Sequence, residues 1–249
     1  MWINVHGFFE DKIFSIQYLP IYGVHGYISE NLRIKDEINN DNEESDFDFY
    51  DDESLQKFLD DEHALSERYK IPDLVAINSD FTTNKSSNFS LRKEAATAFE
   101  LMAWAFSNNF DFKARFTINS ARRSQSFQRQ LAKNCAASRC AKPWTSEHNA
   151  WLAIDLWVNG GNIQAWSWKY FQWMKDNAHL YWFHNSYQKW IDIDGKMVEP
   201  WHRRYLGVEL ATKLYERQQS FTEYFYENVE EEKIDDIEVN KEKENITKK

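Results

Sequence analysis

The sequence predicts an α+β fold, and three observations support this class. Some segments carry apolar residues at helical spacing and others alternate like short strands, and the two kinds are interspersed without a regular β-α-β repeat. The 249 residues suit one domain of ordinary size with extensions, or at most two small domains. Hydrophobic residues make up 42% of the chain, which is enough for a core and excludes global disorder.

The amino-terminal region divides into two segments. Residues 1–35 mix short apolar runs with turns, which indicates a small hairpin or an appendage that packs on the main domain. Residues 36–66 contain the block NNDNEESDFDFYDDES, and acidic blocks of this kind are typical of solvated, flexible linkers. Phe47, Phe49 and Tyr50 interrupt the block, so docking elsewhere on the chain is the alternative.

The main domain is expected at residues 67–227, and its first half contains both helices and a strand. Apolar residues spaced three and four apart predict a core-facing helix over Leu91–Phe106. Lys113–Asn119 alternates like a strand, and Ser124–Lys133 returns to a polar helical pattern. A loop is expected from Cys135 to Glu147.

The second half of the domain has five further predicted elements. In order, they are a strand at Trp151–Val158, a helix at Ile163–Ala178, a short aromatic strand at Leu180–His184, a strand interrupted by Pro200 at Met197–Tyr205, and a helix at Val208–Arg217. Residues 228–249 are almost devoid of apolar side chains, which predicts a disordered charged tail.

Charge and hydropathy exclude two classes of partner. The net charge of −10 disfavours nonspecific nucleic-acid binding, which needs clustered Lys and Arg. No apolar run approaches the roughly 20 residues of a transmembrane helix. The amino-terminal sequence MWINVHGFFEDKIF also lacks the basic-then-apolar layout of a secretory signal.

The two cysteines, Cys135 and Cys140, are not spaced as a CxxC pair, and the chain has no others with which to build a four-cysteine zinc site. Two alternatives remain for them. They are two free thiols in a loop, or they form a small disulfide in an oxidising compartment.

Two histidines stand close in sequence to carboxylates. His148 precedes Asp155 by seven positions, and Glu199 precedes His202 by three. Catalytic zinc takes three ligands from His, Asp or Glu and keeps one position open, so His148, Asp155 and His202 would supply the ligands and Glu199 a free carboxylate. A turn at Pro200 would bring Glu199 and His202 onto one side. Each cluster alone is a weak signal, and the remaining histidines are expected to be ordinary polar residues: His6, His25, His63, His179 and His184.

Together, these clusters resemble a known family. SEHNAWLAID resembles the motif SxHxxGxAxD, EPWHRRYLG resembles ExWHxRYxG, and the upstream SARRSQSFQ resembles SGYRSxxxQ. LRKEAATAFELM and IPDLVAI resemble the helix and the entry segment that precede these motifs. The family is that of the VanY-like D-alanyl-D-alanine carboxypeptidases, within the wider group of lysostaphin-type enzymes and hedgehog domains. The resemblance extends from about Tyr69 to about Lys213.

The resemblance implies a small antiparallel sheet flanked by helices, a single zinc site, and removal of the C-terminal D-alanine from peptidoglycan stem peptides, with either D,D or L,D specificity. Zinc would be the cofactor and the stem peptide the partner. The residues that match family positions are the zinc ligands His148, Asp155 and His202, the general base Glu199, the carbonyl-facing Arg123, and the substrate-binding residues Ser146, Gln128 and Tyr187. Such a substrate implies the cell envelope or periplasm, and a cytoplasmic location is the alternative because no signal is visible.

Three positions depart from the family pattern. Trp151 and Trp182 stand where the family has glycine, and Ser186 stands where it has arginine. If the two tryptophans face each other, their rings would narrow the groove and change substrate preference. Three alternative functions remain: a peptidoglycan endopeptidase of the same fold, a noncatalytic zinc-stabilised wall-binding module, and a general peptidase for L-peptides. The intact Glu199 argues against the binding module, because a structural site needs no free carboxylate.

Overall fold

The computed structural model describes residues 3–9, 12–18, 47–71, 73–86, 89–161 and 168–228. The chain splits into two compact units, Met1–Asp46 and Phe47–Lys249. In the first unit, β1 (Ile3–Phe9) pairs antiparallel with β2 (Lys12–Tyr18), so this segment contains the expected hairpin.

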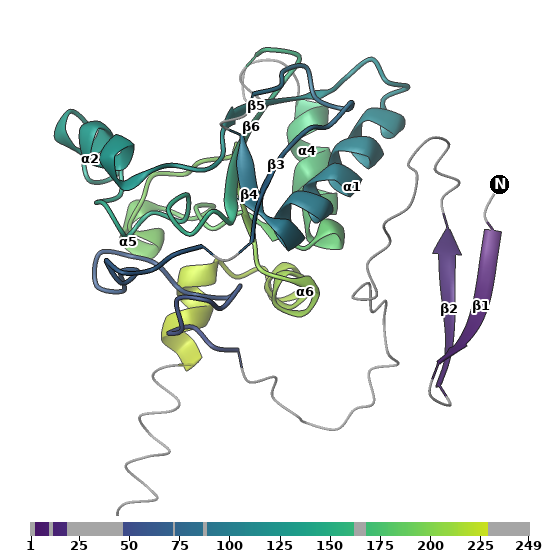
Figure 1. Cartoon of the computed structure of the whole chain (residues 1–249), viewed down its shortest axis with the longest axis horizontal. Helices are drawn as coiled ribbons and strands as arrows, with labels where there is room; N and C mark the ends of the chain where they lie inside the picture. Colours follow the sequence, from purple (N-terminus) through teal and green to yellow (C-terminus); the bar gives the residue numbers. More distant parts are fainter. Residues whose placement is uncertain are drawn as a thin grey trace, which may run out of the picture. The chain divides into compact units, whose positions relative to one another are not determined.

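A four-stranded antiparallel sheet lies at the centre of the second unit (Figure 1). Its spatial order is β5 (Phe116–Ser120), β6 (Ala153–Val158), β8 (His202–Tyr205) and β7 (Phe183–His184). A separate pair, β3 (Leu74–Ala76) and β4 (Ser90–Arg92), was not predicted from the sequence. This architecture confirms the α+β class and the small antiparallel sheet.

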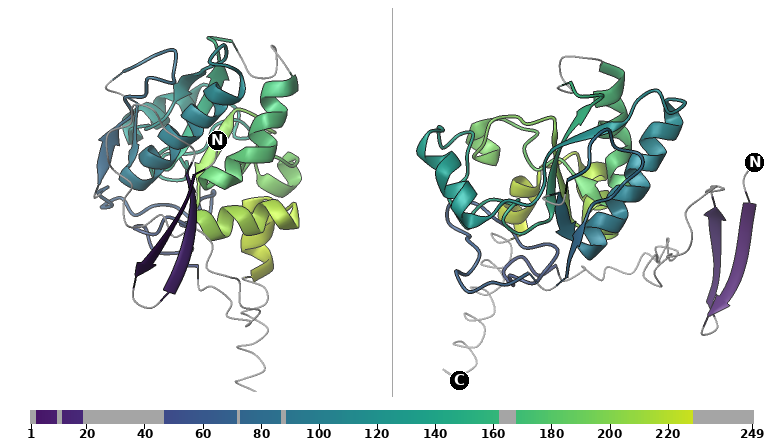
Figure 2. Two further views of the ribbon diagram at one scale, coloured as in Figure 1. Left: turned by 90° about the vertical axis from the view of Figure 1, so that its right-hand side faces the viewer. Right: turned by 45° about the horizontal axis from the view of Figure 1, so that its top comes forward.

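Helices lie on both sides of this sheet. In both figures α1 (Lys93–Asn109) and α4 (Trp168–Asn177) lie beside one another on one side, and α2 (Gln125–Lys133) lies on the other (Figures 1 and 2). The remaining elements are the 3₁₀ helix η1 (Ala178–Tyr181), α5 (Ile191–Asp194), α6 (Val208–Arg217) and a helix at residues 221–228. Within the described residues, no helix has the length and apolar character that a membrane span requires.

The larger core cluster lies between the sheet and the α1 side. Because side chains alternate along a strand, β6 sends Ile154, Leu156 and Val158 into this core and leaves Asp155 for the opposite face. Phe106 of α1 stacks on Phe116 of β5 with ring centroids 4.1 Å apart. Burying one such large side chain contributes roughly 1.5–3 kcal/mol, so this face of the sheet stabilises the strands that carry the site.

A second core cluster shows that residues 47–66, the later part of the linker expected over residues 36–66, pack on the domain, which is the docking alternative. The compact unit begins at Phe47, and both Phe49 and Phe58 are buried. Phe58 stacks on Phe225 of the helix at 221–228 with centroids 3.9 Å apart, and Phe49 packs edge-on against Phe225. The acidic side chains between these aromatics remain at the surface, so the block is acidic on one side and apolar on the other. Residues 36–46 and the predicted tail beyond Asn228 lie outside the described residues.

The predicted strand at Leu180–His184 is only partly correct. β7 covers its last two residues, whereas the preceding segment through Tyr181 is the 3₁₀ helix η1. Between them, Trp182 takes a left-handed φ of 69°, which ends the helical turn. For α4, the predicted start at Ile163 lies outside the described residues.

The predicted strand at Met197–Tyr205 is also shorter than expected, because β8 begins at His202. Pro200 has no N–H to donate to a strand partner. The His202 N–H donates to the Glu199 carbonyl at 3.0 Å, which closes a turn. The turn expected at Pro200 is therefore present, and it places Glu199 just before the first residue of β8.

The register of β8 places its side chains on opposite faces. His202 is opposite Asp155 of β6, and Arg203 is opposite Ile154. His202 therefore lies on the face away from the α1 core, and Arg203 lies on the helix-covered face. Burial lowers the pKa of Arg203 to about 9, so its guanidinium is still protonated at neutral pH.

The loop from Cys135 to Glu147 contains a disulfide. Cys135 and Cys140 are bonded, with Cα atoms 5.8 Å apart. Of the two alternatives that the sequence leaves open, the structure therefore has the small disulfide. The loop is also tied to the turn region, because the Met197 N–H donates to the Ser138 carbonyl at 2.7 Å.

Candidate metal centre

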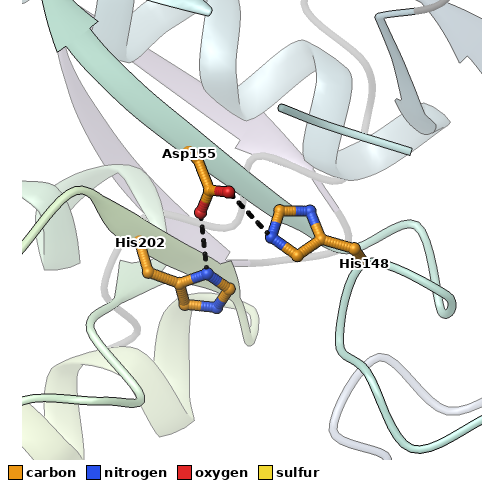
Figure 3. A group of neighbouring side chains, drawn as sticks. All are labelled: His148, Asp155 and His202. Carbon is orange, nitrogen blue, oxygen red and sulfur yellow. Dashed lines mark hydrogen bonds and ion pairs between the residues drawn. The ribbon is translucent and has the colours of Figure 1, made fainter. Parts of the chain in front are cut away.

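Three side chains from different segments meet on the face of the sheet opposite the α1 core (Figure 3). Asp155 and His202 are cross-strand partners on β6 and β8, and His148 comes from the loop before β6. The Asp155 carboxylate lies 3.0 Å from His202 Nδ1 and 3.3 Å from His148 Nε2. One donor atom from each residue lies within 4.8 Å of the others, and all three residues are buried. The structure thus brings together the three residues that the sequence selects.

The local contacts of His148 leave one ring nitrogen for the site. Its Nδ1 lies 2.6 Å from the Ala121 carbonyl, which can only accept a hydrogen bond, so Nδ1 carries the proton. Its Nε2 then presents a lone pair toward Asp155. Burial lowers the pKa of His148, which keeps the ring neutral and able to bind a metal ion at neutral pH.

His202 is oriented by a residue that the sequence analysis missed. Its Nε2 lies 2.7 Å from the Glu147 carboxylate, and Ser186 Oγ donates to the other Glu147 oxygen at 2.9 Å. Carboxylate partners of this kind fix the orientation of a ligating histidine. The available signal was a second carboxylate immediately before His148 in SEHNAWLAID. Ser186, noted only as a departure from the family, is part of this support.

The charges in this cluster compensate one another. Burial alone would raise the pKa of Asp155, but the imidazoles of His148 and His202 that face its carboxylate favour the ionised form and hold the pKa well below its usual range. Glu147 behaves in the same way, with His202 as the main cause of its lowered pKa. Burial would lower the pKa of His202, yet its hydrogen bonds to Asp155 and Glu147 raise it to about 9. Two carboxylates thus hold a protonated imidazole, and a metal cation would take the place of that proton.

Glu199 stands beside the cluster at a cavity of about 290 Å³. Its backbone N–H donates to the Tyr187 carbonyl at 2.9 Å, and that contact fixes the start of the turn. Burial raises the pKa of Glu199 to about 7, while nearby His202 and a side-chain hydrogen bond from Trp201 act in the opposite direction. Trp201 follows Glu199 and Pro200 in the same turn. It lines the cavity, and it also contacts the carboxylate.

Arg123 is held at the same cavity. Its Nη2 donates to Asp155 Oδ2 at 2.7 Å, and its Nε donates to Ser120 Oγ at 2.9 Å. Without the family pattern, the sequence could not distinguish Arg123 from Arg122. The structure distinguishes them, because Arg122 instead lies over the Trp151 ring, 5.1 Å from its centroid.

The three expected substrate-binding residues occupy different places. Ser146 and Tyr187 line the cavity, and the Tyr187 ring centroid lies 4.8 Å from that of His202. Gln128 is fully buried and is not among the residues that line the cavity. Its Nε2 donates to the Ala141 carbonyl at 2.7 Å, and Ala141 does line the cavity. In this structure Gln128 supports the wall of the cavity and does not form it.

The two tryptophans at the family's glycine positions keep a glycine-like backbone. Trp151 has φ 60° and Trp182 has φ 69°, both in the left-handed region. Neither side chain is among those that line the cavity, so the expected narrowing of the groove is not found in the described residues. At both positions, the backbone thus takes a conformation that glycine adopts without strain.

Comparisons with known proteins agree with this geometry. Residues 88–208 match the family model VanY, D-alanyl-D-alanine carboxypeptidase. A D-alanyl-D-alanine carboxypeptidase of Enterococcus faecalis is 36% identical over 94 residues, which are 37% of this chain and 34% of that protein. The chain therefore matches about a third of the length of this relative.

Solved structures show the same fold. The LD-carboxypeptidase LdcB is 29% identical with a TM-score of 0.63, over 70% of this chain and 87% of that one. A variant of the vancomycin-resistance D,D-pentapeptidase VanY, solved in complex with Zn(II), is 22% identical with a TM-score of 0.54, over 68% of this chain and 97% of that one. At this identity the second likeness concerns the fold alone.

Proposed function

We propose that the protein is a zinc-dependent carboxypeptidase of the VanY family of D-alanyl-D-alanine carboxypeptidases, whose family model matches residues 88–208. Its substrate would be the peptidoglycan stem peptide, from which it removes the C-terminal D-alanine. One observation carries this proposal: the buried group of His148, Asp155 and His202 shares a cavity with the free carboxylate of Glu199.

The donor set fits zinc. Two imidazoles and one carboxylate match the three protein ligands of a catalytic zinc site, which leaves a position open for water or substrate. The lone pair of His148 Nε2 is available for a metal ion, and Asp155 is ionised. The Glu147 carboxylate orients the His202 ring through its contact with Nε2. Zinc in the VanY neighbour supports the same choice of metal. When bound, the metal supplies Lewis acidity for the scissile carbonyl and makes a nearby water easier to deprotonate.

The residues of the chain would perform the proton and charge steps. Glu199, with a pKa raised to about 7 by burial, takes a proton from the attacking water and returns it to the leaving amine. Arg123 is permanently cationic and faces the cavity, where it stabilises the oxyanion that develops on the carbonyl. Trp201 orients the Glu199 carboxylate through their hydrogen bond.

The cavity also offers cations for the free end of a peptide. Arg139 and Lys196 both line it. Among the described residues, Arg139 makes no ion pair and Lys196 has one distant partner, Asp61, at 4.0 Å. An exopeptidase must recognise a terminal carboxylate, and Arg and Lys supply the charge for this. This favours a carboxypeptidase over an endopeptidase, for which the end of the groove would be open.

The test uses zinc-loaded protein with three peptides: a stem pentapeptide, a stem tetrapeptide, and the pentapeptide amidated at its C-terminus. Release of D-alanine from the pentapeptide marks D,D activity, and release from the tetrapeptide marks L,D activity. Amidation should abolish cleavage, and Glu199→Gln should remove activity while zinc stays bound. Cleavage that is unaffected by amidation would indicate an endopeptidase. Absence of cleavage with zinc bound would contradict the carboxypeptidase proposal and favour a noncatalytic binding module.

A further inference from the structure

A second cavity lies on the helix-covered face of the sheet, behind the metal centre. Its volume is about 160 Å³. Its wall comes from α4, η1, β7 and α6, together with Arg203 of β8. None of the described residues that line it is Asp or Glu, and the nitrogen-bearing side chains on its wall are Lys175, His179, His184, Asn185, Gln188, Arg203 and Gln218.

Arg203 is the feature that requires explanation. It is 2% exposed and lies opposite Ile154, on a face where strands carry apolar side chains. Both of its hydrogen bonds use Nη1, to the Pro200 carbonyl at 3.1 Å and the His202 carbonyl at 2.6 Å. Within the described part of the chain it has no carboxylate within 4.0 Å, and its Nε and Nη2 have no hydrogen-bond partner. A buried guanidinium without an anion is costly.

A ring nitrogen on the same wall also lacks a partner. The Nδ1 of His179 is buried and makes no hydrogen bond to the described residues, while its ring is stacked on Tyr215 at 3.6 Å. Apolar side chains complete the wall, among them Met174, Phe183 and Leu214. The cavity therefore combines a fixed cation, an unpartnered ring nitrogen and an apolar lining, and none of the described residues that line it is acidic.

We propose that this cavity binds a small carboxylate anion, with the Arg203 guanidinium as its partner and a short apolar body against the helices. The size is suitable, because a cavity of roughly 150 Å³ holds a molecule of about six non-hydrogen atoms. Planar pairing with carboxylates is the geometry that a guanidinium favours. Acetate and alanine are ligands of this class.

The position of the cavity couples it to the metal centre. Arg203 Nη1 joins the carbonyls of Pro200 and His202, which belong to the turn that presents Glu199. Val198 and Pro200 also line the cavity, on either side of Glu199. An anion that draws on Arg203 therefore acts on the backbone that positions the base and one metal ligand. This second step rests on the proposed function, whereas the binding itself does not.

Binding is measured on zinc-free full-length protein by calorimetry with sodium acetate and with alanine, at ionic strength held constant with chloride. We expect saturable binding that Arg203→Leu weakens by about tenfold or more, since hydrogen bonds to a charged group are lost. Arg129→Leu, at an exposed position, is the matched control and should bind as the wild type does. Asn185→Asp places a carboxylate on the cavity wall and should weaken acetate binding by repulsion. This variant tests the site independently if Arg203→Leu fails to fold.

Two results would overturn the proposal. One is the absence of saturable binding, which would mean that the cavity holds only water. The other is binding that survives Arg203→Leu or Asn185→Asp but disappears in a variant carrying both Arg139→Leu and Lys196→Met, which would place the anion in the substrate cavity. If the site is confirmed, acetate should also change the kcat for peptide cleavage in the wild type and not in Arg203→Leu. Binding without that change would remove only the coupling to the metal centre.

Discussion

Glu199 illustrates how burial prepares a single residue for chemistry. An exposed glutamate is fully ionised at neutral pH and is a weak base. In this cavity, burial raises its pKa to about 7, close to the value at which a general base is most effective at neutral pH. The same burial makes the ionised form unfavourable in the folded protein, so the proposed catalytic residue should reduce stability.

This cost can be measured in the zinc-free protein. The folded-state pKa of Glu199 lies above its unfolded value, so the stabilising, protonated form is lost as the pH rises from about 4.5 through 7. Glu199→Gln should therefore increase the free energy of unfolding by up to roughly 3 kcal/mol at pH 8 and by almost nothing at pH 4. Denaturant unfolding at the two pH values tests this, with the exposed Glu67→Gln as control. Equal stability of the variant and the wild type at pH 8 would contradict the buried, ionised state of Glu199.

Glu147 leads to a second prediction for a single residue, because its carboxylate contacts His202 Nε2 and orients the ring. Glu147→Ala should lower zinc affinity by about 10- to 100-fold, the usual effect of losing a partner of a ligating histidine. Glu147→Gln keeps an oxygen that can accept the Nε2 proton and should lose less. Competition with a chromogenic chelator measures affinity without reference to activity. If Glu147→Ala bound zinc within twofold of the wild type, the orienting role would be excluded.

At the scale of elements, the turns into β6 and β7 place bulky tryptophans in a backbone conformation that glycine adopts most readily. Trp151 and Trp182 both have positive φ, where most side chains are strained by roughly 1–2 kcal/mol. Trp151 offsets part of this strain by stacking with Arg122. In addition, its carbonyl accepts a hydrogen bond from the Arg92 N–H at 2.9 Å, which anchors the turn to β4.

Paired substitutions separate the ring from the backbone. Trp151→Gly and Trp151→Ala both remove the indole, but only glycine adopts φ 60° without strain. We expect the glycine variant to be the more stable by about 1 kcal/mol. At Trp168, the exposed first residue of α4, the order should reverse, because alanine is the better helix former. Thermal unfolding of the four variants tests this, and an alanine variant at position 151 as stable as the glycine variant would argue against the strained turn.

Elements with strong local patterns could be predicted from the sequence. The predicted helix Val208–Arg217 coincides with α6, and the predicted helix Leu91–Phe106 lies almost entirely within α1, because both carry an apolar face at helical spacing. The missed pair β3 and β4 has three residues per strand, too few to show alternation. Boundaries at β7 and β8 were wrong because a left-handed Trp182 and the turn at Pro200 override the apolar pattern there.

The site itself was predictable only in part. His148, Asp155 and His202 could be selected because each histidine stands close in sequence to a carboxylate, and because the two motifs together resemble those of a zinc peptidase family. The role of Glu147 and Ser186 could not, since it depends on contacts between residues 39 positions apart in the chain. Gln128 shows the opposite case, in which a matched position proves to be fully buried behind the cavity wall.

At the scale of the whole molecule, residues 47–66 belong to the folded unit and not to a linker. Phe49, Phe58, Leu59 and Leu65 are buried, and their partners lie some 150 or more residues further along the chain or in the main core. Composition alone could not show this, because the acidic residues dominate the average and hide the spacing of the aromatics.

Two truncations test this boundary. A chain that begins at Phe47 should retain the cooperative unfolding of the second unit. A chain that begins at residue 67 loses four buried apolar side chains, worth roughly 1.5–3 kcal/mol each, which is comparable with the whole stability of an ordinary domain. We expect it to be unfolded or aggregated by circular dichroism and gel filtration. A soluble, cooperatively folded chain from residue 67 would restore the linker interpretation.

We propose above that His148, Asp155, His202 and Glu199 form one zinc-dependent hydrolytic site. The most direct measurement strips the protein with chelator and titrates zinc back while D-alanine release from stem pentapeptide and tetrapeptide is followed. We expect activity to rise with bound zinc and to saturate at one zinc per chain. We also expect His202→Ala to lose zinc binding, and Glu199→Gln to bind one zinc but release no D-alanine. Release that is equally fast without zinc, or that persists in Glu199→Gln, would contradict this proposal.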